Sequence, residues 1–239
     1  MMSEPILIIE NVVKHFGEVA VLRGVNASLP SGKVTAFVGP NGAGKTTLFH
    51  TITGDLIPDD GVVSLRGRPI TGMAPWKVAR NGLGKMFQDV RVFDSLTVLE
   101  NVLIAMYEPE ALSPWASLVK AYFHRRDDSE LLMEAETWLD KAGVEKPYDR
   151  PAGLLSFGNK KLLALARLMA GGFDLLLLDE PTAGVSPIMV EKIARLIKQM
   201  TNQGITVALI EHNYSFVTDV AEHIYLMRDG MIHDHGTVA

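Results

Sequence analysis

The stretch that decides the fold is Gly39-Pro-Asn-Gly-Ala-Gly44-Lys45-Thr46, which fits the pattern GxxxxGK[ST]. It follows an apolar run at residues 34–38 that predicts a buried strand, and a helical run at 47–53 comes directly after it. Glycines allow backbone N–H groups to point inward at phosphate oxygens, and the N-terminus of a helix adds partial positive charge. The sequence therefore predicts a loop that binds the phosphates of a nucleotide.

Two side chains of this loop have predicted chemical roles. Lys45 is expected to reach the β- and γ-phosphates of ATP, and the Thr46 hydroxyl is expected to ligate Mg²⁺. The other candidate nucleotide contacts in the loop are Gly39, Asn41, Gly42, Gly44 and Thr47. A chance match to the four constrained positions has a probability of about 1% in a chain of this length. ATP and Mg²⁺ are therefore the predicted cofactors.

A pair of acids follows a second predicted strand. Four leucines at 175–178 end in Asp179 and Glu180. Because the carboxyl ends of parallel strands meet at one edge of a sheet, we expect both acids beside the phosphate loop. Asp179 is expected to hold Mg²⁺ through a water molecule, and Glu180 to be the general base that polarises the attacking water. Without a phosphate loop, solvated acids at a strand end would explain the pattern equally well.

Strands and helices alternate along the rest of the chain. Apolar or β-branched runs predict strands at 6–13, 62–65, 205–210 and 223–227. Residues 189–203 have one apolar helical face, and Ser186 with Pro187 predicts the start of that helix. Residues 97–143 have a helical pattern and no predicted strand. This organisation predicts an α/β core with a helical insertion.

The composition narrows the class of protein. The 239 residues include 23 Lys and Arg against 28 Asp and Glu, a net charge of −5. That balance argues against nucleic acid as a partner. The absence of cysteine excludes disulfides and thiolate metal sites. The sequence has no signal-peptide pattern, and its richest apolar window, 162–178, is interrupted by Arg167 and Asp174. We therefore expect a soluble chain that reaches any membrane through a partner.

A third motif connects the first two. Leu155-Ser156-Phe157-Gly158-Asn159 is similar to the signature LSGGQ, and Ser156 is a suitable N-cap for a helix reaching Ala170. With this motif between the phosphate loop and the acidic pair, the sequence resembles the ATP-binding subunit of ABC transporters. The resemblance implies an α/β fold: a P-loop NTPase ABC-type ATPase core with an N-terminal antiparallel β region and a helical subdomain. It implies a single domain over 1–239, with the core at about 1–90 and 165–239 and the helical subdomain at about 91–164.

The resemblance assigns roles to further residues. Gln88 matches the glutamine that senses Mg²⁺ and the attacking water, and is both a catalytic and a metal candidate. His212 matches the histidine that contacts the γ-phosphate, and Phe16 the aromatic residue that stacks on adenine. Ser156 and Gly158 match the element that contacts ATP held by another subunit. A lone His or Phe has a structural role more often than a functional one, so these roles depend on the full set of motifs.

Three positions depart from the family pattern. Asn159 stands where the signature usually has Gln, and Phe157 where it usually has Gly. Ser186 stands where an Asp usually helps to couple the two active sites of a dimer. We expect these departures to affect the coupling between sites more than catalysis itself.

Three segments are similar to the subfamily that serves branched-chain amino acid importers, whose relatives import urea and short amides. They are residues 88–102, the long helical stretch that follows them, and residues 183–187. Exporter ATPases for lipopolysaccharide are also similar in sequence. The alternatives are therefore such an exporter, a non-transport ABC ATPase acting on DNA or ribosomes, and a regulatory module without turnover.

The resemblance also implies partners. They are integral membrane permease subunits, a second ATP-binding subunit paired head to tail, and, indirectly, a periplasmic or extracellular solute-binding protein. The implied location is the cytoplasmic face of the membrane. We expect a permease to contact residues 91–99 and 115–123, where Trp115 and Phe123 are partner contacts or subdomain core.

Overall fold

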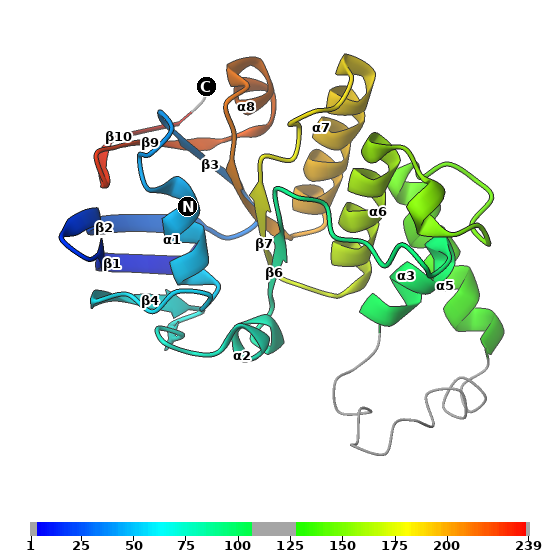
Figure 1. Ribbon diagram of the computed structural model, residues 1–239, viewed down its shortest axis with the longest axis horizontal. Helices are drawn as coiled ribbons and strands as arrows, with labels where there is room; N and C mark the ends of the chain where they lie inside the picture. The colour runs from blue at the N-terminus through cyan, green and yellow to red at the C-terminus, as the bar shows by residue number, and fades with distance from the viewer. Residues whose placement is uncertain (1–3, 107–127, 238–239) are drawn as a thin grey trace. The chain divides into compact units, whose positions relative to one another are not determined.

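The computed structural model describes residues 4–106 and 128–237, which form two compact units (Figure 1). Unit 1 consists of Met1–Gln88, Phe173–Ala183 and Pro187–Ala239. Unit 2 consists of Asp89–Gly172 and Gly184–Ser186. Trp115 and Phe123, the two aromatic residues considered as permease contacts, lie outside the described residues.

The larger sheet of unit 1 contains the strands that precede the candidate site. Its strands are β3 (Val34–Val38), β6 (Leu83–Met86), β7 (Leu175–Asp179), β8 (Thr206–Ile210), β9 (His223–Arg228) and β10 (Met231–Thr237). Their order is β10-β9-β3-β8-β7-β6, and every pair is parallel except β10 with β9. All residues of β3, β7 and β8 are buried, which confirms three strands predicted from their apolar runs.

The smaller sheet of unit 1 is antiparallel, as the family resemblance implied. It consists of β1 (Pro5–Phe16), β2 (Val19–Pro30), β4 (Asp60–Leu65) and β5 (Arg68–Pro69) in the order β2-β1-β4-β5. The helices of this unit are α1 (Lys45–Ile52), α2 (Pro75–Arg80), α7 (Pro187–Asn202) and α8 (Tyr214–Val220). Helix α7 begins at Pro187, the predicted first helical residue.

One hydrophobic core joins the two sheets of unit 1 through α1. Leu7 of β1, Phe37 of β3 and Phe49 of α1 all belong to it and are fully buried. The Phe37 ring meets the Phe49 ring edge to face at 5.9 Å and stacks on Tyr225 at 5.3 Å. This packing fixes α1, and therefore the loop before it, against the parallel strands.

The sequence pattern missed strand β6. Gly84 and Lys85 interrupt its apolar character. A Cβ at Gly84 would lie 2.7 Å from the Phe173 ring and 2.9 Å from the Leu176 side chain. The glycine is thus required by close packing against residues distant in the sequence, which a local pattern does not reveal.

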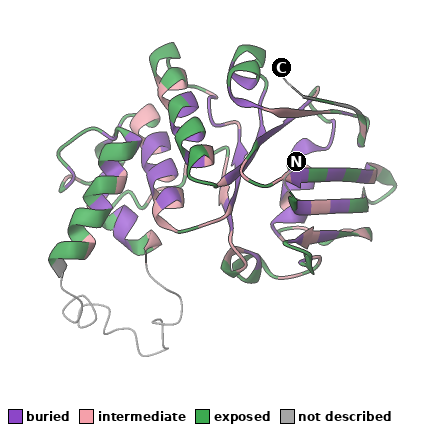
Figure 2. Ribbon diagram, turned by 180° about the vertical axis from the view of Figure 1, so that it is seen from behind, coloured by how far each residue is buried: buried purple, intermediate pink, exposed green. Residues whose placement is uncertain are grey.

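Unit 2 is helical over its described residues. Its helices are α3 (Val98–Ala105), α5 (Asp128–Ala142), the 3₁₀ helix η3 (Ala152–Leu154) and α6 (Phe157–Ala170). Helices α3, α5 and α6 pack against one another (Figure 1). Figure 2 shows buried residues along α6 and a largely exposed α5. Helix α6 packs on both neighbouring helices, and the longer segment of this unit extends to Gly172.

Within the part of the chain that the structure describes, no helix combines the length and the apolar composition needed to cross a membrane.

Thr35 offers a test of the β3 packing. Its side chain is fully buried, and among the described residues Oγ1 has no hydrogen-bond partner. Replacing an unsatisfied hydroxyl with a methyl group removes a desolvation cost, so Thr35→Val should raise the free energy of unfolding by about 1 kcal/mol. Thr206→Val is the matched control, because the equally buried Thr206 Oγ1 accepts from the Gly32 N–H at 2.9 Å. Urea denaturation should show opposite shifts, and equal shifts would contradict this account.

Candidate active site

The phosphate loop connects β3 to α1 in unit 1. Gly39 has φ 155°, and a Cβ there would collide with the carbonyl oxygen of Met227 on β9. Gly44, the N-cap residue of α1, provides no side-chain cap, and the first turn contains no acidic residue. The first N–H groups of a helix have no partner within it. The loop therefore ends in backbone donors suited to an anion.

Lys45 is held inside this loop. Its side-chain ammonium donates to the carbonyl oxygens of Gly39 at 2.8 Å and Pro40 at 2.9 Å. Burial lowers the pKa of Lys45, while the carboxylates of Glu180 and Asp179 oppose that shift. The ammonium is thus placed among acceptors in a partly desolvated position, where it would interact strongly with phosphate oxygens.

Asp179 has the features of a metal ligand. It is 4% exposed, and among the described residues its Oδ1 is buried without a hydrogen-bond partner. Burial raises the pKa of Asp179 and Glu180 raises it further, whereas Lys85, His50 and Lys45 lower it. An unpartnered carboxylate oxygen fits a divalent cation.

The donor set favours Mg²⁺ among such cations. Thr46, at the start of α1, is exposed and adds a hydroxyl oxygen in the same unit. The described residues contain no cluster of three His, Cys, Asp or Glu for a metal. One carboxylate and one hydroxyl oxygen are a donor set that fits Mg²⁺, which typically takes one or two protein oxygens together with phosphates and water.

Two predicted catalytic residues, Gln88 and His212, contact the third, Glu180. The Gln88 side-chain amide donates to Glu180 Oε2 at 2.9 Å, and His212 Nε2 lies 3.3 Å from Glu180 Oε1. Glu180 itself has φ 47°, a left-handed conformation that is unusual for a glutamate. Its backbone N–H donates to the Ile210 carbonyl at 3.0 Å, which joins the ends of β7 and β8. The parallel register places Asp179 opposite Ile210 on β8, just before His212, and Met86 of β6, two residues before Gln88, opposite Leu178 on β7.

The remaining predicted residues lie elsewhere. Phe16 ends β1 with 48% of its surface exposed, and the Lys14 ammonium lies 5.8 Å from its ring centre. Ser156 and Gly158 begin α6 in unit 2, so they do not share a unit with the phosphate loop. The Ser156 side chain accepts from the Asn159 N–H at 3.3 Å, which confirms the predicted N-cap.

The substitution at Asn159 has a local explanation. Its amide Nδ2 donates to Ser156 Oγ at 3.0 Å, and its Oδ1 accepts from the Glu145 N–H at 3.0 Å. Ser156 Oγ therefore accepts from two donors of one residue. Its own hydroxyl hydrogen must point away from both, which leaves it available to donate to an anion.

Sequence reasoning missed a polar cluster near Asp179. The Lys85 ammonium, nearly buried, lies 2.9 Å from Asp55 Oδ2 and 3.2 Å from His50 Nδ1. Both Lys85 and His50 lower the pKa of Asp179. No local signal could have found Lys85, because its β6 environment comes from strands distant in the sequence.

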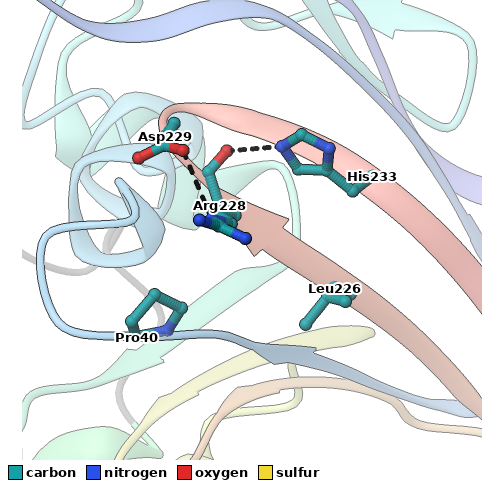
Figure 3. Close-up of a pocket in the computed structure, with 5 residues that line it drawn as sticks. All are labelled: Pro40, Leu226, Arg228, Asp229 and His233. Atoms are coloured by element: carbon teal, nitrogen blue, oxygen red, sulfur yellow. Dashed lines mark hydrogen bonds and ion pairs between the residues drawn. The ribbon is translucent and has the colours of Figure 1, made fainter.

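A cavity of about 600 Å³ adjoins the phosphate loop at Pro40 (Figure 3). Pro40, Leu226, Arg228, Asp229 and His233 line it. His233 Nε2 lies 3.0 Å from the Arg228 carbonyl oxygen, and Arg228 Nε lies 3.4 Å from Asp229 Oδ2. The other four lining residues come from β9, β10 and the turn between them, and none of the lining residues belongs to the group around Glu180.

Comparison with known proteins identifies the family. The family model described as ABC transporter matches residues 22–183, more than half of the chain. The chain belongs to the ABC transporter family. This confirms the resemblance drawn from the three motifs, and with it the fold class and the assignment as a nucleotide-binding ATP hydrolase.

Relatives of this ABC ATPase match it over nearly its full length. It is 35% identical over 237 residues to LivG of Escherichia coli K12, a high-affinity branched-chain amino acid transport ATP-binding protein, covering 99% of this chain and 93% of LivG. It is also 35% identical to BraF of Pseudomonas aeruginosa, which has the same description, covering 96% and 90%.

Two solved structures match this ABC ATPase over nearly its full length at similar sequence identity. A nucleotide-free ATP-binding cassette from an ABC transporter has a TM-score of 0.83 at 36% identity, covering 98% of this chain and 91% of that one. Another ABC transporter cassette, in its ADP conformation, has a TM-score of 0.83 at 34% identity, covering 98% and 92%.

Two glycines of the phosphate loop should respond differently to alanine. Gly39→Ala places a Cβ against the Met227 carbonyl and should lower the free energy of unfolding by more than about 2 kcal/mol. Gly42, with φ 79° and open space around it, is the matched control and should cost about 1 kcal/mol from conformation alone. Denaturant unfolding measures both. A Gly39→Ala variant as stable as Gly42→Ala would contradict the close approach of β9 to the loop.

Proposed function

We propose that this chain is the ATP-hydrolysing subunit of an importer for branched-chain amino acids or a related small polar solute such as urea or an amide. The observation that carries the hydrolytic part is the meeting of Gln88 and His212 at Glu180, in the same unit as Lys45. The solute class is supported by the names of LivG and BraF.

The phosphate loop would bind and orient ATP. Backbone N–H groups from Gly39, Asn41, Gly42 and Gly44 to Thr47, together with the Lys45 ammonium, would hold the phosphates, and Phe16 would stack on adenine. Asp179, Thr46 and Gln88 would hold Mg²⁺ directly or through water. When bound, Mg²⁺ supplies positive charge to the β- and γ-phosphate oxygens.

Glu180 would accept the proton of the attacking water. Its carboxylate is oriented from two sides by Gln88 and His212, and His212 would also contact the γ-phosphate. Most of the rate enhancement would come from positioning and charge stabilisation, as in other phosphoryl transfers.

A second ATP-binding subunit would complete the site head to tail, and the two units of this chain would act as one ABC ATPase domain. Ser156, whose hydroxyl is oriented by Asn159, and Gly158 would contact the γ-phosphate bound by the partner. The α6 N-terminus adds favourable charge. Ser186 in place of the usual Asp would weaken the coupling between the two sites.

Permease subunits would hold the chain at the cytoplasmic face of the membrane, while a solute-binding protein delivers the solute outside. The predicted permease contact at 91–99 contains Phe93, which is 45% exposed and lies 4.9 Å from the Arg167 guanidinium. Its partly desolvated aromatic surface is suited to burial by a partner.

Glu180→Gln tests the hydrolytic role. The variant should bind ATP with Mg²⁺ normally, lose at least about 100-fold in turnover, and accumulate as an ATP-bound dimer. Lys45→Ala is the comparison variant and should lose ATP binding. Phosphate release, binding of a fluorescent ATP analogue and light scattering measure the three properties. Normal turnover of Glu180→Gln would remove Glu180 from the role of general base.

Affinity purification from detergent-solubilised membranes tests the transport role. Full-length tagged chain should recover integral membrane permeases and a second ATP-binding subunit, identified by mass spectrometry. The Phe93→Asp variant should recover less permease, because a buried carboxylate without a partner is costly. Recovery of no membrane protein by the unaltered chain would contradict the transport role.

A further inference from the structure

Glu211 is a buried carboxylate that the hydrolytic scheme does not use. It follows the buried strand β8 directly and is 4% exposed. Its Oε1 accepts from the Thr182 N–H at 2.8 Å and from the Thr182 hydroxyl at 2.6 Å. Its Oε2 accepts from the N–H groups of His212 at 3.0 Å and Asn213 at 3.3 Å. Four donors thus converge on one side chain.

The hydrogen bonding excludes a role for Glu211 as the general base. Each of its oxygens already accepts from two donors, and the side chain is shielded from water. A general base needs a free lone pair within reach of the attacking water. Glu180, by contrast, is partly exposed. Glu211 is therefore able to position other groups but not to take the proton.

The two segments that Glu211 joins are those that carry Glu180 and His212. Thr182 follows Glu180 by two residues, and Glu180 adopts the unusual φ of 47°. His212 directly follows Glu211, and Asn213 in turn caps α8 by accepting from the Phe216 N–H at 3.1 Å. The carboxylate therefore fixes both sides of the 3.3 Å contact between His212 and Glu180.

We propose that Glu211 is a positioning residue for ATP hydrolysis and that the Thr182 hydroxyl is its partner. Together they hold the turn after β7 against the turn after β8, so that Glu180 and His212 face the same γ-phosphate. Four donors require a group that only accepts, which a carboxylate provides and the NH₂ of a glutamine does not. A shift of about 1 Å between catalytic groups costs up to about 100-fold in rate. This inference rests on the proposed hydrolytic function of Glu180.

Steady-state ATPase kinetics of the full chain, purified with its membrane partners, test the inference. Thr182→Val removes the hydroxyl while keeping the shape, and should lower kcat about tenfold with KM for ATP changed less than about twofold. Thr182→Ser keeps the hydroxyl and should stay within about twofold of the unaltered chain in both constants. Glu211→Gln should lower kcat further, because its NH₂ must face donors of one of the two turns. Adding Thr182→Val to it should cause less than the additive loss, because both changes weaken the same link.

Thr206→Val separates positioning from a general loss of stability. It also removes a buried hydrogen bond, to the Gly32 N–H, without touching the link between the two turns. It should unfold at lower urea concentration while its kcat stays unchanged. Equal losses of kcat in Thr206→Val and Thr182→Val would overturn the inference, and so would a serine variant as slow as the valine variant.

The outcome also distinguishes this inference from the proposed function. If the unaltered chain hydrolyses ATP and Thr182→Val matches its kcat, the positioning role is wrong and the proposed function stands. If the Glu180→Gln variant hydrolyses ATP at the normal rate, the proposed role of Glu180 is wrong, and the positioning role of Glu211, which depends on it, is wrong as well. Should Glu211→Gln fail to fold, the comparison of Thr182→Val with Thr182→Ser still decides.

Discussion

Parallel hydrogen bonding between β3, β8 and β7 places the carboxyl ends of three buried strands at one edge of the larger sheet. The phosphate loop leaves the first strand, Glu211 and His212 follow the second, and Asp179 and Glu180 end the third. None of these segments is adjacent in the sequence. The pairing register therefore determines which side chains of these segments meet, and the contact of His212 with Glu180 depends on it.

The site contains several buried charged side chains, and they differ in how many of their hydrogen-bonding positions are satisfied by the protein. Each carboxylate oxygen of Glu211 accepts two hydrogen bonds from the protein, which is typical of a carboxylate with a structural role. Asp179 is equally buried, but among the described residues its Oδ1 has no hydrogen-bond partner. The Lys45 ammonium donates to the loop carbonyls of Gly39 and Pro40. Buried charged groups whose hydrogen-bonding positions are not all satisfied by the protein are the ones suited to bind a charged ligand.

The strands buried on both faces were predictable because their residues are continuously apolar, and α6 was predictable because Ser156 is a good N-cap. Strand β6 was not, since Gly84 is there to accommodate Phe173 and Leu176. The packing of α6 with α3 and α5 in one compact unit was also not evident from the sequence, because it depends on contacts between separate segments.

The sequence by itself determined the chemistry of this protein: a loop that binds phosphate, an acidic pair after a buried strand, and membership of a family of ATPases. Local patterns suffice for these because a short contiguous run of residues specifies each one. Only the tertiary structure decided that Gln88 and His212 contact Glu180, that Asn159 orients the Ser156 hydroxyl, and that Glu211 is saturated while Asp179 is not. These depend on distances between side chains from separate segments, which packing and strand register fix and which no local pattern encodes.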